Sequence, residues 1–148
     1  MKIGIANDHG GVELKFAVIE YLQSKGYEVV NFGSDTLDRV DFPIYAFKLG
    51  EALRDKSIDY GIAICKSAIG MSVACNKVKG VRCAAVYNME DAKHAKRNDY
   101  INIIALSGEN ISTVDNIKIV EAFLNEENGD DPAYANRRDQ IVSYENAH

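Results

Sequence analysis

The chain has 148 residues with a net charge of −5, and 47% of them are hydrophobic and 26% charged, which suits one ordinary globular domain over residues 1–148. The negative balance argues against a general nucleic-acid surface or an acidic membrane as a partner. No apolar run approaches the ~20 residues of a membrane span, and three cysteines without a Cys-x-x-Cys motif predict a reducing cytoplasm as the compartment.

Short apolar, β-branched runs alternate along the chain with segments of helical periodicity. The runs predict strands at about 2–6, 27–32, 61–65, 82–86 and 102–106. The periodic segments predict helices at about 12–25, 43–55, 71–77, 89–96, 113–125 and 133–146. Strict alternation is typical of a parallel sheet with helices on both faces. We therefore expect the α/β class: a three-layer α/β/α sandwich around a Rossmann-like, five-stranded parallel sheet.

Polar residues that could take part in catalysis follow two of the predicted strands. Asp8 and His9 come directly after the first strand, and Cys65 ends the third. In parallel sheets of this kind, ligands bind beyond the carboxyl ends of the strands, where the strand order reverses. If strands one and three are neighbours, these three side chains face one crevice. The plainer alternative for Asp8 is a helix N-cap, with His9 as a surface histidine.

The stretch 58–78 combines a buried strand, a turn of small residues and a helix. A strand that enters a helix through such a turn brings unpaired N–H groups and the positive helix end together. That arrangement suits a carboxylate, a phosphate or an enolate oxygen, and it would stabilise a thiolate on Cys65. The alternative is a buried structural cysteine, which is common; Cys75 and Cys83 are interpreted as core residues, and His94 as a residue of a helix face.

Several segments in this order resemble the type B ribose-5-phosphate isomerase and galactose-6-phosphate isomerase family over nearly the whole chain. They are 7–11 (Asn-Asp-His-Gly-Gly), 29–33 (Val-Val-Asn-Phe-Gly), 41–43 (Asp-Phe-Pro), 64–72 and 74–82. The resemblance implies aldose–ketose isomerisation of a small phosphorylated sugar through a cis-enediolate, with neither a metal nor a cofactor.

The resemblance also assigns roles to residues of this chain. Cys65 would be the base that moves the proton, and Ser67, where the family usually has threonine, would contact the enediolate. Asp8 and His9 would line the sugar and serve ring opening and phosphate contact. The rest of the turn that would line the substrate comprises Lys66, Ala68, Ile69 and Gly70.

The family's site is shared between two subunits, so the resemblance implies a homodimer or tetramer. The C-terminal helix, 133–146, would pack on the partner. Groups reaching the partner's site would come from Arg97, Asn98, Asp99, Arg137 and Arg138.

The chain departs from the family pattern at four places, one of which is the C-terminal Arg-His-x-x-Arg pattern, reduced to Asn-Arg-Arg at 136–138. The family's Cys-Gly-Thr-Gly turn is Cys-Lys-Ser-Ala at 65–68, so a position that needs positive φ would be strained. The segment 96–99 lacks the family's histidine, and Glu109 lies where an arginine often binds phosphate.

These departures leave two hypotheses. The first is an active isomerase of the ribose 5-phosphate/ribulose 5-phosphate type. The second is a non-catalytic, sugar-phosphate-binding subunit of a hetero-oligomer such as galactose-6-phosphate isomerase. A flavodoxin-like nucleotide binder is disfavoured, because no glycine-rich phosphate loop follows the first strand.

Overall fold

The computed structural model describes all 148 residues and contains five strands and six α-helices in strict order. The strands are β1 (Lys2–Asn7), β2 (Glu28–Asn31), β3 (Tyr60–Cys65), β4 (Cys83–Ala85) and β5 (Ile103–Ser107). The helices are α1 (Val12–Ser24), α2 (Phe42–Arg54), α3 (Ile69–Cys75), α4 (Met89–Asp99), α5 (Thr113–Asn125) and α6 (Pro132–Ala147). The predicted alternation is therefore confirmed. A short 3-10 helix, η1 (His9–Gly11), was not predicted.

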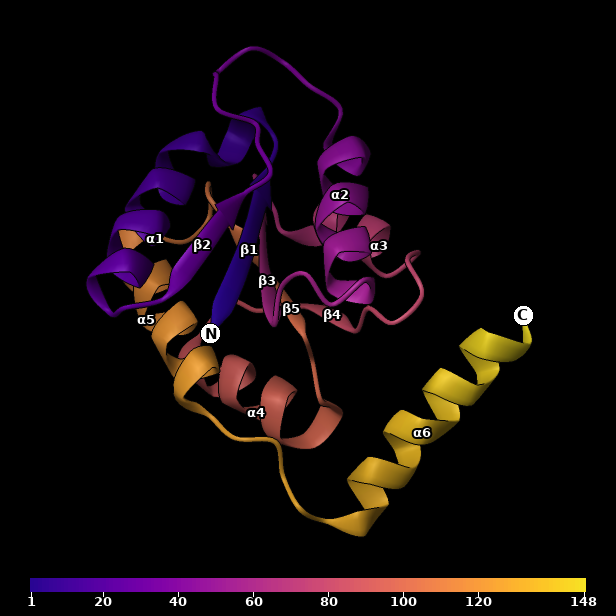
Figure 1. Ribbon diagram of the computed structural model, residues 1–148. Helices are drawn as coiled ribbons and strands as arrows, with labels where there is room; N and C mark the ends of the chain where they lie inside the picture. Colours follow the sequence, from indigo (N-terminus) through magenta and orange to yellow (C-terminus); the bar gives the residue numbers. More distant parts are fainter.

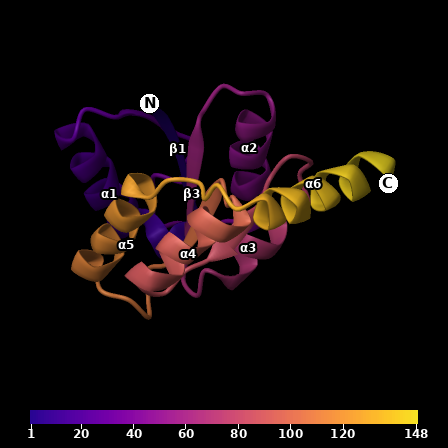
Figure 2. The same ribbon diagram turned by 90° about the horizontal axis from the view of Figure 1, so that it is seen from below.

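All five strands are parallel and lie in the order β2-β1-β3-β5-β4. One hydrophobic cluster joins the sheet to α1, α4 and α5, and a second joins the opposite face to α2 and α3. Figures 1 and 2 show these three layers. The α/β/α sandwich expected from the sequence is confirmed, and the strand order reverses between β1 and β3.

The elements form where the apolar pattern places them. In β3, Ile62 and Ile64 belong to one cluster while Ala63 and Cys65 belong to the other, so both faces of the strand are covered. In α1, Leu14, Val18 and Leu22 are buried along one stripe, at the spacing that makes a helix amphipathic. This packing fixes the ends of the strands from which the functional loops emerge.

Helix α6 differs from the others because none of its residues is buried. It extends away from the three layers (Figures 1 and 2), and the side chains of Ile141 and Tyr144 are exposed. No helix in the structure has both the length and the apolar character that a bilayer crossing requires.

Candidate active site

The carboxyl ends of β1 and β3 are neighbours, as the site hypothesis requires. The two strands pair directly, with Asn7 opposite Ile64. The Asp8 N–H continues the ladder by donating to the Ile64 carbonyl at 3.2 Å. Asp8 and Cys65 are therefore held at the same edge of the sheet, and both are buried.

The loops that follow the two strands touch each other. A Cβ atom on Gly10 would lie 2.6 Å from Lys66 Cγ and 3.3 Å from the Lys66 nitrogen. Any larger residue there would have to push the Lys66 side chain aside. Asp8 accepts a hydrogen bond from the Gly10 N–H at 2.8 Å, so the N-cap interpretation of Asp8 is confirmed. The segments that follow Asp8 and Cys65 are thus in direct contact.

The turn after Cys65 contains a strained residue. Ala68 has φ 72 and ψ −18, the left-handed conformation, at the position before α3. That conformation costs a non-glycine residue roughly 1–2 kcal/mol. The loss of glycine here therefore leaves strain, as expected from the sequence, but the turn still forms. Helix α3 has seven residues, so the local N–H groups matter more here than a long helix dipole.

Donors from neighbouring loops hold the carbonyl groups of this turn. The Ser107 hydroxyl donates to the Lys66 carbonyl, and the Tyr87 hydroxyl donates to the Ser67 carbonyl at 2.9 Å. The Gly108 N–H donates to the Cys65 carbonyl at 2.9 Å. These three carbonyl groups are therefore occupied. The N–H groups of Ser67 and Ala68, in contrast, have no acceptor in the chain. Such free donors are the groups that stabilise a developing oxyanion.

The His9 ring is oriented by the loop that precedes α2. Its Nδ1 accepts a hydrogen bond from the Val40 N–H at 3.1 Å. Because Nδ1 must be the acceptor, the neutral ring carries its proton on Nε2. His9 is therefore prepared to donate a hydrogen bond from Nε2 to a bound oxygen.

A cavity of about 570 Å³ opens beside Asp8 and His9. Its other lining residues belong to the loop before α2 and to the first turn of that helix: Arg39, Val40, Asp41, Phe42, Pro43 and Ile44. Neither Cys65 nor Ser67 lines it. The Ser67 hydroxyl instead accepts from the Ile69 N–H at 3.2 Å. Gly70 packs under the Phe42 ring, since a Cβ on it would lie 2.9 Å from Phe42 Cζ.

The remaining predicted residues lie far from this edge within one chain. Helix α4 leaves the carboxyl end of β4 and returns toward the amino end of β5, so Arg97, Asn98 and Asp99 lie at the opposite edge. Arg97 forms an ion pair with Glu126 at 3.1 Å. Arg138 is stacked 4.5 Å over the Tyr100 ring, and Arg137 is 5.7 Å from the Tyr134 ring. A single chain therefore does not bring these arginines to Cys65.

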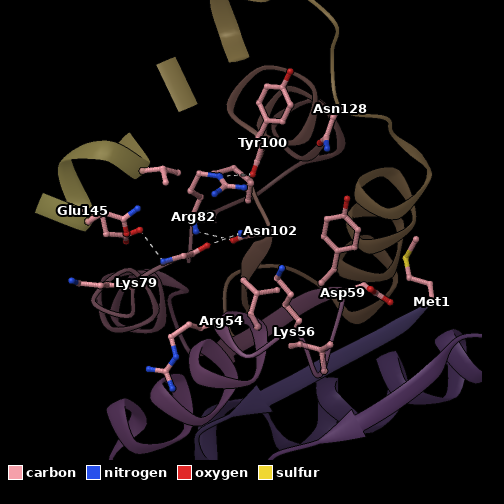
Figure 3. A pocket seen from close by; sticks show the side chains of 17 residues that line it. Met1, Arg54, Lys56, Asp59, Lys79, Arg82, Tyr100, Asn102, Asn128 and Glu145 are labelled. Carbon is pink, nitrogen blue, oxygen red and sulfur yellow. Dashed lines mark hydrogen bonds between the residues drawn. The ribbon is translucent and has the colours of Figure 1, made fainter. Parts of the chain in front are cut away.

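A larger cavity, about 820 Å³, lies at that opposite edge, between α6 and the body of the molecule (Figure 3). The Arg82 Nε donates to the Tyr100 carbonyl at 2.8 Å, and Glu145 accepts from the Gly80 N–H at 2.9 Å. Burial and the neighbouring Arg138 cation lower the pKa of Arg82. This cavity contains none of the residues that follow β1 or β3.

Two residues near the candidate site were not found from the sequence. Arg39 lies in a segment interpreted only as a polar loop, and it lines the cavity with Asp8. Lys15 has no exposed side-chain surface although it lies in an amphipathic helix. An amphipathic helix is recognised from the spacing of its apolar residues, so this spacing does not reveal that a lysine is buried. The structure brings together no group of three His, Cys, Asp or Glu side chains suited to hold a metal ion.

Comparison with known proteins agrees with this geometry. A family described as Ribose/Galactose Isomerase matches residues 3–141. A Mycoplasma genitalium protein named "Probable ribose-5-phosphate isomerase B" is 37% identical over 145 residues, covering 97% of this chain and 95% of the relative. The ribose-5-phosphate isomerase B of Clostridium thermocellum superposes with a TM-score of 0.96 at 35% identity, covering 99% of both chains. The Mycoplasma genitalium ribose-5-phosphate isomerase B with bound ribulose-5-phosphate gives 0.93 at 36% identity, covering 99% of this chain and 97% of that one.

The fold defines the class of protein: a doubly wound α/β enzyme, with its candidate site at the switch point between β1 and β3. The chain belongs to the ribose/galactose isomerase family, and it is accordingly an isomerase.

Proposed function

We propose that the chain interconverts an aldose phosphate and a ketose phosphate of the ribose 5-phosphate/ribulose 5-phosphate type. The proposal is supported above all by the contact between the Asp8–His9 loop and the Cys65 turn at the switch point. The solved relative that contains bound ribulose-5-phosphate supports this choice of substrate.

In the proposed reaction, Cys65 moves one proton between two neighbouring carbons. The Cys65 thiolate takes the proton from C2 of the open-chain aldose, and the released electron pair forms the C1=C2 bond. The carbonyl oxygen O1 then carries the negative charge of a cis-enediolate. The O2 proton passes to O1, the O2 electron pair forms the C2=O2 double bond, and the C1=C2 electron pair takes the proton back from the thiol at C1, which gives the ketose. General acid–base catalysis of this kind contributes about 10²–10⁴-fold.

The turn after Cys65 would stabilise the charge that develops on the enediolate. The free N–H groups of Ser67 and Ala68, together with the Ser67 hydroxyl, are the proposed donors. Removing one such donor typically costs about 2.7–4 kcal/mol of transition-state stabilisation. Lys66, Ile69 and Gly70 would complete the wall of the site.

Asp8 and His9 would hold the sugar and assist ring opening from the cavity that they line. The Nε2–H of His9 is a suitable donor to a ring or phosphate oxygen, because its Nδ1 is already occupied. Arg39 adds a cation to the same cavity, where it would favour an anionic substrate.

We infer that a second copy of the chain completes the site. Arg97, Asn98, Asp99, Arg137 and Arg138 cannot serve the Cys65 of their own chain, because they lie at the opposite edge of the sheet. The exposed apolar side chains of α2, α3 and α6 support a homodimer: Ile44, Phe47, Ile69, Val73, Ile141 and Tyr144. Phosphate would then be bound by arginines from the partner.

The test is proton exchange followed by NMR. The purified protein is incubated in D2O with aldose and ketose phosphates of four to six carbons, beside a Cys65→Ala control. Deuterium should enter C1 or C2 of the pentose phosphate with the active protein and not with the control.

Two results would contradict the proposal. Wild-type exchange in Cys65→Ala would remove Cys65 as the base. Binding of the sugar phosphates without any exchange would instead favour a non-catalytic subunit.

A further inference from the structure

The buried lysine of α1 has no role in the proposed reaction, yet its surroundings connect it to the site. The Lys15 side chain has 0% exposed surface. Its Nζ donates to the Ser34 carbonyl and forms an ion pair with Asp35 Oδ1, and it lies 4.7 Å from the Phe16 ring centre. Burying a cation is costly unless it is paired and hydrogen-bonded. Packing alone therefore does not explain why a lysine is buried at this position.

Lys15 fastens one end of the loop at residues 33–41, which joins β2 to α2 and contains no helix or strand. Ser34 is buried at this end, and its carbonyl also accepts from Asn7 Nδ2 at 2.9 Å. Backbone bonds add to the attachment, since the Ser34 N–H donates to the Asn7 carbonyl at 2.8 Å. The Asp35 carboxylate is held in turn by Asn31 Nδ2 at 2.8 Å.

The other end of the same loop holds His9. The Val40 N–H donates to His9 Nδ1, and between the two attachments residues 35–39 are exposed. Asn7 connects the two ends by a second route, because its Nδ2 also donates to the Asp8 carbonyl at 2.7 Å. Displacement of Ser34 would therefore be transmitted both to the Val40 donor and to the backbone beside Asp8.

We propose that Lys15 is a positioning residue of the isomerase site, which holds the 33–41 loop so that its Val40 N–H keeps His9 in the Nε2–H tautomer. Lys15 touches no substrate; it acts through Ser34, Val40 and His9. The inference rests on the proposed function only for its kinetic consequence, because the tautomer of His9 can be measured without any turnover.

The decisive variant is Lys15→Met, which has a similar length and is apolar. The variant leaves no buried group unpaired, because the Asp35 side chain is 61% exposed to water and the Ser34 carbonyl retains Asn7 as a donor. The matched control is Lys25→Met, which removes the same charge from an exposed position directly after α1.

Two quantities are measured in each full-length variant: the ¹⁵N shifts of the His9 ring, and KM and kcat with ribose 5-phosphate. Lys15→Met should show a mixture of His9 tautomers and a KM raised about tenfold, with a smaller change in kcat, since misplaced binding groups weaken orientation. Asp35→Asn, which removes one of the two partners of Lys15 Nζ, should show a minor second His9 tautomer and a KM raised about two- to threefold. Lys25→Met should match the wild type in both quantities.

An unchanged tautomer and KM in folded Lys15→Met would overturn the proposal, as would equal changes in Lys25→Met. If Lys15→Met does not fold, Asp35→Asn decides, and wild-type values in that variant would overturn the proposal as well. A wild-type protein that shows the single His9 tautomer but no isomerisation would contradict the proposed function and leave the role of Lys15 in orienting His9 intact.

Discussion

Ala68 holds a backbone conformation that glycine adopts more easily, directly beside the proposed base. The Ala68→Gly substitution should relieve the strain at φ 72 and raise the free energy of unfolding by about 1 kcal/mol or less, because the added chain entropy of glycine offsets part of the gain. Chemical denaturation measures this difference. Ala74→Gly, within α3 in ordinary helical geometry, is the control and should lower stability by about 1 kcal/mol. A destabilised Ala68→Gly protein would show that the turn is not strained.

The three buried cysteines are expected to differ in their contributions to activity and to stability. The hydrogen bond with Cys75 and burial raise the pKa of the Cys83 thiol, so this thiol stays protonated and provides no thiolate to act as a base. Cys65→Ala should lower kcat by about 10²–10⁴-fold. Cys75→Ala should keep kcat within about twofold and lose stability, since a buried side chain is shortened. Steady-state kinetics and denaturation of both variants test this, and equal losses of kcat would contradict it.

At the scale of an element, the loop at 33–41 links protonation to stability. The hydrogen bond from Lys15 is the largest cause of a lowered pKa for Asp35. A carboxyl with a lowered folded-state pKa stabilises the protein above its unfolded pKa, and that contribution is lost as the pH falls through the folded value. Because the Asp35 side chain is 61% exposed, its contribution is expected to be below about 1 kcal/mol.

Asp35→Asn should therefore be less stable than the wild type near neutral pH, and the difference should disappear at acidic pH once Asp35 is protonated. Urea denaturation at both pH values measures the effect. Asp38→Asn removes the same charge from the same loop, where the carboxylate has only a weak contact with Thr36 at 3.4 Å. A difference of the same size in Asp38→Asn would attribute the effect to net charge.

The order of the elements could be predicted from the sequence because each depends on local periodicity. The stripe of Leu14, Val18 and Leu22 and the run that forms β3 carry that signal. The insertion of β5 between β3 and β4 could not be derived, because apolar runs of similar length pair equally well. The predicted site required β1 and β3 to be neighbours in the sheet, and the two strands do pair directly.

The candidate site was predictable only where its residues follow strand ends. Asp8, His9 and Cys65 do so, and the structure groups their loops. Lys15 and Arg39 come from a helix and an irregular loop, so their places depend on tertiary contacts made by residues 33–41. The arginines of α6 were expected at a shared site, and within one chain they lie at the opposite edge of the sheet.

At the scale of the whole molecule, one chain separates the two groups of residues that the reaction would need. Asp8, His9 and Cys65 lie at the carboxyl edge of the sheet, while Arg137 and Arg138 lie on a helix without buried residues at the other end. An isologous dimer would bring each group to its counterpart in the partner, and it would form two such sites. The exposed apolar surface of α6 would be covered by the same contact.

This arrangement predicts that two inactive variants restore each other. Cys65→Ala and the double variant Arg137→Ala/Arg138→Ala should each lose most activity as homodimers. Co-refolded in equal amounts, they should recover about a quarter of the wild-type rate, because half of the dimers are mixed and each mixed dimer has one intact site. Cys65→Ala mixed with Asp8→Asn is the control. Both changes lie on the same side of the site, so the mixture should stay inactive. Recovery in the control alone, or in neither mixture, would show that Cys65 does not act together with the arginines of a second subunit.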